Sequence, residues 1–266
     1  MPSVHLERLK PQINAITSHY ENSDLFTNSL IALLESYSGE IDFSPTKISP
    51  FSIVPRMNVP IVVLSQLEIS LKISVKLFPE QTKMIVRNLW NYGFFESKKL
   101  AIFLLSNLPS IESNSIFKEI EMWVKDDIEY PILSEIFANI NNVNILSQDP
   151  QWMRLIGTWL SSKTERLNKI GIKALINHIQ TNPIKDLPAI FHSIEPLLSN
   201  PHISINTELL QLIKSLIILS QAETAAFLIH LSVMNKTKEN YSFIRKCLPL
   251  FDTYFVSEIK KKLANF

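Results

Sequence analysis

One short region of the chain combines tryptophan with a row of basic residues, and together these could hold a phosphate backbone. Trp152 and Trp159 are followed by four cations, spaced three, three and four residues apart. These are Lys163, Arg166, Lys169 and Lys173. Residues three or four apart lie on one face of an α-helix, so the spacing predicts a basic helix face that could contact phosphates. A solvated helix surface, partly neutralised by Glu165, is the competing interpretation.

Other charged and aromatic groups have simpler explanations. Trp90 lies between Arg87 and the Lys98-Lys99 pair, and we interpret it as a core anchor. Three carboxylates before Pro131 could do acid–base work, but a solvated turn explains them better. They are Asp126, Asp127 and Glu129. The C-terminal lysine run at 260–262 complements a helix dipole and needs no ligand.

Several kinds of chemistry are not expected. The six histidines are scattered, with no pair four residues apart, so we expect no metal site. The single cysteine, Cys247, excludes an internal disulfide, and its apolar neighbours indicate a core thiol rather than a nucleophile. The four glycines are far apart, which argues against a phosphate-cradling loop or a dinucleotide-binding fold. The sequence therefore predicts neither a metal nor a small-molecule cofactor.

Composition favours a folded protein away from membranes. Of the 266 residues, 46% are hydrophobic and 19% are charged, and the formal net charge is +1. A near-neutral charge counts modestly against DNA binding, because proteins held by phosphates usually carry a clear basic excess. The N-terminus has no signal-peptide pattern, and no run of about 20 uncharged apolar residues occurs. We expect a soluble, cytoplasmic protein.

The apolar residues recur with the spacing of amphipathic helices. Residues 3–38 are expected to form a helix pair, and the prolines five residues apart in 41–59 predict a loop. From residue 60 onward, helices should alternate with short breaks. We place them near 60–77, 80–91, 94–108, 112–126, 131–142, 148–160, 163–179, 187–198, 203–218, 221–233, 237–248 and 252–264.

The helical pattern also repeats. The run 99–105 aligns with 169–175, and 134–140 matches them halfway between, which gives a period near 35 residues. One helix pair per period is typical of an α-solenoid. Small residues such as Ala101 and Gly171 would lie where helices approach closely. The sequence thus predicts an all-α superhelix of antiparallel helix pairs over 1–266, with 1–40 as a cap, 41–59 as a loop and 60–266 as repeats. An irregular helical bundle is the alternative.

Over roughly residues 55 to 230 the chain resembles the HEAT-like-repeat DNA alkylation repair proteins, the AlkD-type alkylpurine DNA glycosylases. Three segments carry the resemblance. They are Ile85-Val86-Arg87-Asn88-Leu89-Trp90 with the helix that follows, Trp123 through Ile140, and Trp159 through Ile172. The resemblance implies a HEAT-like fold that binds DNA in a concave face.

The positions that match the family's catalytic residues have changed. Active members have a Trp and, four residues later, an Asp that stabilises charge on the sugar. Tyr130 and Ser134 match these positions, and Ser134 carries no charge. Lys169 matches a family arginine, and Gln211 lies near a further family Trp. Glu135 is one residue from the Asp position, which turns it about 100° around the helix.

Three functions remain open. The first is a DNA-alkylation-repair-like protein that binds duplex or distorted DNA with weak or no glycosylase activity. Its expected DNA contacts are Lys99, Tyr130, Lys163, Arg166, Lys169 and Lys173. The second is a non-enzymatic scaffold for a protein partner. The third is an active glycosylase that uses a displaced carboxylate among Glu135, Asp127 and Glu129.

Overall fold

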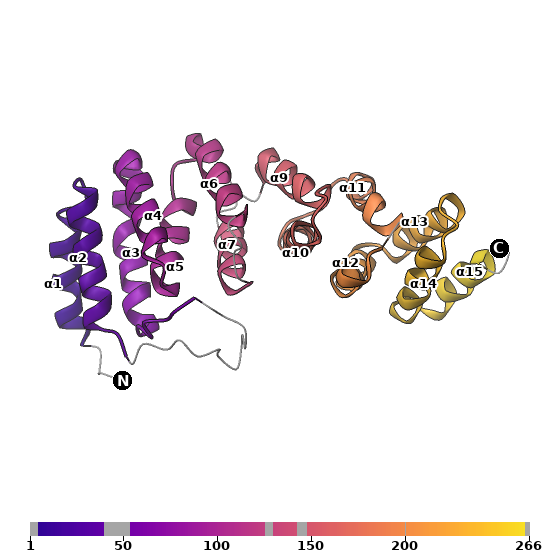
Figure 1. Ribbon diagram of the computed structural model, residues 1–266, viewed down its shortest axis with the longest axis horizontal. Coiled ribbons are helices and arrows are strands. Elements are labelled where there is room, and N and C mark those ends of the chain that lie inside the picture. The colour runs from indigo at the N-terminus through magenta and orange to yellow at the C-terminus, as the bar shows by residue number, and fades with distance from the viewer. Residues whose placement is uncertain (1–4, 40–53, 126–129, 143–147, 200, 264–266) are drawn as a thin grey trace. The chain divides into compact units, whose positions relative to one another are not determined.

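A computed structural model of the chain describes residues 5–39, 54–125, 130–142, 148–199 and 201–263. Within these ranges there are fourteen α-helices, three short 3-10 helices and no strand (Figure 1). The expected all-α class is therefore confirmed. Each helix predicted from residue 60 onward is present, and its ends fall within a few residues of the expected ones.

The chain divides into two compact units, Met1–Asp149 and Pro150–Phe266. Each unit is described by itself below. The superhelix and the single 1–266 domain stay predictions.

The N-terminal unit consists of two layers of helices. In one layer α1, α3, α5 and α7 are adjacent in that order, and in the other α2 packs on α4. Side-chain contacts join α6 to α4, including stacked Trp90 and Trp123 rings whose centroids lie 3.9 Å apart. The bounds are α1 Leu6–Thr17, α2 Ser23–Ser36, α3 Ile61–Leu77, α4 Pro79–Tyr92, α5 Phe95–Ser106, α6 Ser113–Lys125 and α7 Tyr130–Asn142.

The end of the proline-spaced segment is fastened to the start of α5. The buried Glu96 carboxylate accepts hydrogen bonds from the backbone N–H groups of Met57 and Asn58, at 3.0 and 2.9 Å. The Arg56 guanidinium lies 3.9 Å from the centre of the Phe95 ring. Residues 40–53 of the expected loop lie outside the described residues.

The C-terminal unit repeats the two-layer plan. Helices α10, α12 and α14 follow one another along one side, and α9, α11, α13 and α15 along the other (Figure 1). The bounds are α9 Pro150–Leu160, α10 Glu165–Thr181, α11 Leu187–Ser199, α12 Asn206–Leu219, α13 Gln221–Met234, α14 Lys238–Cys247 and α15 Thr253–Leu263.

A close contact joins α9 to α10. A Cβ atom at Gly171 would lie 2.9 Å from the backbone nitrogen of Leu160, so only glycine allows this approach. Beside it, the buried Asn168 amide donates to the carbonyls of Trp159, Leu160 and Ser162 at 3.1, 2.9 and 3.0 Å. These bonds satisfy carbonyls that the end of α9 leaves unpaired. The expected close approach at Gly171 is confirmed.

Two further expectations concern the core and the membrane. Cys247 is fully buried, as expected for a core thiol. This burial raises the pKa of the thiol to about 12. Among the described residues, no helix has the length and apolar character needed to cross a membrane. The same residues contain no cluster of three or more potential metal ligands from histidine, cysteine and carboxylate side chains.

Candidate nucleic-acid interface

The four cations expected on one helix face come together at α10. Lys163 is exposed in the turn before the helix, and three partly exposed cations follow on the helix itself. They are Arg166, Lys169 and Lys173. Because the opposite side of α10 is buried in the unit through residues such as Ile172 and Leu175, these side chains lie on the outward face of the α10–α12–α14 layer. We call this set the α10 basic face.

Glu165, which could neutralise the α10 basic face, is held by other groups. One carboxylate oxygen lies 2.9 Å from Nδ1 of His202, and the other accepts a hydrogen bond from the Ser204 hydroxyl. Ser204 belongs to the short 3-10 turn that precedes α12, and His202 is the residue just before that turn. Within the described residues, Lys163 and Lys169 form no salt bridge. Two cations of the face, Lys163 and Lys169, are therefore not neutralised by Glu165 through an ion pair.

The two tryptophans next to this face belong to the core. Trp152 and Trp159 are almost completely buried and meet edge to face, with centroids 5.7 Å apart. Their rings support α9 against α10 and cannot stack on a base. The α10 basic face thus offers charge without an aromatic platform.

Lys99 lies in the N-terminal unit and already has acidic neighbours. Its Nζ is 3.3 Å from Oε1 of Glu135 on α7, and both side chains are less than one-quarter exposed, at 23% and 24%. Glu68 on α3 belongs to the same cluster. Burial raises the pKa of the Glu68 carboxyl, the Glu135 charge raises it further, and the charges of Lys99 and Lys72 lower it. The structure therefore places Lys99 among carboxylates.

Comparison with known proteins decides the family. Residues 57–247 match the model of the family described as "DNA alkylation repair enzyme". The chain belongs to this family. The match runs from just before α3 to the end of α14, so α1, α2 and α15 lie outside it. No curated protein and no solved structure matched the chain.

The positions that we matched from sequence to the alkylation repair family's catalytic residues fall on α7. Ser134, which we expect at the position of the family's Asp, is exposed. Tyr130 is the first residue of α7, but its side chain lies outside the described residues, as do Asp126, Asp127 and Glu129. Gln211, near the position of a further family Trp, is exposed on α12. Among the carboxylates considered from sequence, Glu135 is the one the structure describes, and it is paired with Lys99.

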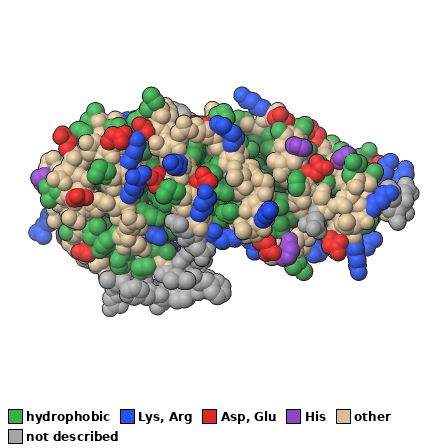
Figure 2. All heavy atoms as spheres, turned by 45° about the horizontal axis from the view of Figure 1, so that its top comes forward, with side chains coloured by type: hydrophobic (Ala, Val, Ile, Leu, Met, Phe, Trp, Pro, Cys, Tyr) green, Lys and Arg blue, Asp and Glu red, His purple; other side chains and the backbone are tan. Residues whose placement is uncertain are grey.

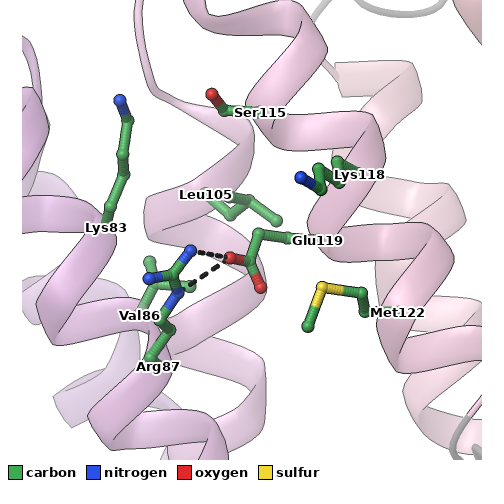
Figure 3. A pocket seen from close by; sticks show the side chains of 8 residues that line it. All are labelled: Lys83, Val86, Arg87, Leu105, Ser115, Lys118, Glu119 and Met122. Atoms are coloured by element: carbon green, nitrogen blue, oxygen red, sulfur yellow. Dashed lines mark hydrogen bonds and ion pairs between the residues drawn. The ribbon is translucent and has the colours of Figure 1, made fainter.

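A cavity that the sequence did not indicate lies between α4 and α6. Figure 3 shows Arg87 and Glu119 pointing toward each other there, with Arg87 Nη2 2.6 Å from Glu119 Oε1. The volume is about 250 Å³, and the lining residues are Lys83, Val86, Arg87, Leu105, Ser115, Lys118, Glu119 and Met122. Lys83 is paired with Glu80 and Glu112. The pairs of Lys83 with Glu112 and of Arg87 with Glu119 join α4 to the segment that contains α6. We therefore interpret them as contacts that hold the two helices together.

Surface charge is mixed on the face drawn in Figure 2, where basic and acidic side chains are interspersed with hydrophobic ones. That face carries no broad field of one sign. The α10 basic face is the group of predicted DNA contacts that the structure brings together.

Proposed function

We propose that this member of the DNA alkylation repair family binds duplex or distorted DNA through the α10 basic face, with weak or no glycosylase activity. The observation that carries the proposal is the geometry of Glu165. Its carboxylate contacts His202 and Ser204, and among the described residues Lys163 and Lys169 beside it form no salt bridge. Phosphates are the natural partners for such a row.

The distribution of charge supports this assignment. The C-terminal unit contains 14 Lys and Arg against 8 Asp and Glu, which is a net charge of +6. The N-terminal unit contains 12 against 17, which is −5. The near-neutral total therefore hides a basic half, and the objection to DNA binding from net charge does not apply to the unit that carries α10.

The chemistry of α7 supports weak or absent glycosylase activity. A departing base leaves positive charge on the sugar, and a fixed carboxylate would stabilise it. Ser134 offers only a hydroxyl at the family's carboxylate position. Glu135 next to it is engaged by Lys99, which lowers the negative charge available to a substrate.

DNA binding is tested by fluorescence anisotropy with a labelled duplex at two salt concentrations, with abasic and mismatched duplexes alongside. We expect micromolar or tighter binding that weakens steeply with salt. The double variant Lys163→Glu/Arg166→Glu should bind at least tenfold more weakly. Unchanged affinity in this variant, with a native circular dichroism spectrum, would contradict the proposal.

A second function, a scaffold for a protein partner, is favoured by one observation on α3. Four large apolar side chains on this helix are 62% to 75% exposed. They are Ile61, Ile69, Ile73 and Leu77. Exposed apolar surface of this kind is typical of interaction sites. If the protein fails to bind any of the duplexes at low salt, pull-downs that compare the wild type with Ile69→Ser/Ile73→Ser are the next experiment.

The third function, an active glycosylase with a displaced carboxylate, depends on Glu135 among the described residues. Its carboxylate would have to leave Lys99 to approach a sugar. The discriminating variants are given in the Discussion.

A further inference from the structure

We infer that the phosphate-binding surface continues beyond α10 as a row of Lys173, Lys214 and Arg245 on three neighbouring helices, which holds the backbone of one nucleic-acid strand without reading its bases. This inference rests on the proposed function and extends it to two helices that the sequence did not single out. We call these three residues the cationic row.

Each member of the row lies opposite the buried side of its helix. On α12 the residues Leu209, Leu212, Ile213 and Leu216 are fully buried, and Lys214 is exposed about half a turn away from the centre of that buried side. On α14 the buried residues are Phe243, Ile244 and Cys247, and Arg245 is exposed on the other side. Both cations therefore face outward, as Lys173 does on α10.

The three residues also lie at similar positions along their own helices. Lys173 is eight residues after the start of α10, Lys214 eight after the start of α12, and Arg245 seven after the start of α14. The three helices are neighbours in one layer, α12 lying between α10 and α14. Similar positions on outward faces of adjacent helices support reading the three cations as one row across the layer.

The charges around the row leave the side chains of Lys214 and Arg245 available for a phosphate. Within the described part of the chain, neither forms a salt bridge. The acidic residues of these two helices, Glu208 and Glu239, lie in the first turns, at least one turn before the row. The last turn of α14 adds a further exposed cation, Lys246, beside Arg245.

The length of the row suits a single strand. Packed helices lie about 8–10 Å apart, so three neighbours span about 16–20 Å. One strand of B-DNA places a phosphate about every 3.4 Å along the axis, so the row covers about five or six phosphates. The two aromatic residues of α14 do not face the row: Phe243 is buried, and Tyr241 donates its hydroxyl to the Ser232 carbonyl at 3.3 Å and so turns toward α13. The row therefore offers contacts to phosphates and no platform for bases.

The test uses the full-length protein and anisotropy with two labelled duplexes of unrelated sequence over a series of salt concentrations. The row variant is Lys214→Glu/Arg245→Glu. Its matched control, Arg154→Glu/Lys261→Glu, makes the same charge change at exposed residues of α9 and α15. We expect the row variant to bind roughly tenfold more weakly and its salt dependence to fall by about two units of slope, whereas the control keeps the wild-type slope.

The possible outcomes separate this inference from the proposed function. If the Lys163→Glu/Arg166→Glu variant loses affinity but the row variant keeps the wild-type slope, the row is wrong and the proposed function stands. Equal weakening of row variant and control would also overturn the row, because net charge alone would explain it. A wild-type protein that binds neither duplex overturns both. A strong preference of the wild type for one of the two duplex sequences would show that bases are recognised, and would contradict the inference. Lys214→Gln/Arg245→Gln repeats the test with a gentler change, and circular dichroism checks its fold.

Discussion

The Nζ atom of Lys99 lies 3.3 Å from Oε1 of Glu135, which joins α5 to α7 at the residue next to Ser134, the residue that we matched from sequence to the family's catalytic Asp. This pair changes two expectations at once. Lys99, an expected phosphate contact, is already paired with a carboxylate. Glu135, the carboxylate next to the position of the missing Asp, is already paired with a cation.

The first prediction concerns base excision. Restoring a carboxylate with Ser134→Asp should produce measurable release of alkylated purine from a methylated duplex, because the new charge would be at the position where the sugar develops positive charge. Release of free base, followed by chromatography, is the measurement. Glu135→Gln should leave the wild-type level unchanged. If Glu135→Gln abolishes an activity present in the wild type, the displaced-carboxylate reading is correct and the proposed weak activity is wrong.

A pair of glycine substitutions tests the packing beneath the α10 basic face. Gly171→Ala should lower the free energy of unfolding by about 1–3 kcal/mol, because its Cβ would press on the backbone of Leu160. Gly157→Ala, on α9, should raise it by about 0.5–1 kcal/mol, because a Cβ there meets nothing within 4 Å and alanine favours a helix. Urea unfolding measures both. Equal effects of the two substitutions would contradict the close approach at Gly171.

The side chain of Asn168 should matter for the same junction. Asn168→Ala removes the donor to three carbonyls at the end of α9 and should cost about 1–3 kcal/mol of stability. It should also weaken DNA binding indirectly, since the α10 basic face is positioned by this contact. Thermal unfolding and anisotropy on the same sample check both effects. A stable variant with no change in Tm would show that the three bonds contribute little.

The pH dependence of stability should reveal the titration of the Glu68 carboxyl. Its folded-state pKa is raised above 4.5 chiefly by burial, so its contribution to stability is fully present below pH 4.5 and is lost as the pH rises through the folded pKa. Glu68→Gln removes this titration. Relative to the wild type, the variant should therefore be more stable at pH 7 than it is at pH 4. Unfolding in urea at both pH values is the measurement, and a relative loss at pH 7 would mean that attraction to Lys99 and Lys72 outweighs burial.

Cys247 should react with thiol reagents only when the protein unfolds. With a pKa of about 12, roughly one thiol in ten thousand is ionised at pH 8, and the side chain is fully buried. An aromatic disulfide reagent followed by absorbance should show no reaction in buffer and rapid reaction in concentrated urea. Prompt labelling of the native protein would place this thiol outside the core.

Sequence alone determined the helices, the family and the α10 basic face. A spacing of three and four residues fixes which side chains share a face of a helix, and it does so without knowledge of the fold. For this reason Lys163, Arg166, Lys169 and Lys173 could be grouped, and helix ends could be placed at prolines and glycines. Gly171 could be recognised as a contact because a repeat period marks where helices meet.

Only tertiary structure decided which of these charges have partners. Glu165 is close to the basic residues in sequence but is held by His202 and Ser204, which lie 37 and 39 residues later. Lys99 and Glu135 are 36 residues apart and meet because α5 and α7 are neighbours in one layer. The helices that carry Lys173, Lys214 and Arg245 are likewise brought together only by the packing of α10, α12 and α14. Electrostatic interactions act through space over a few ångströms, and no local spacing rule relates side chains on different helices.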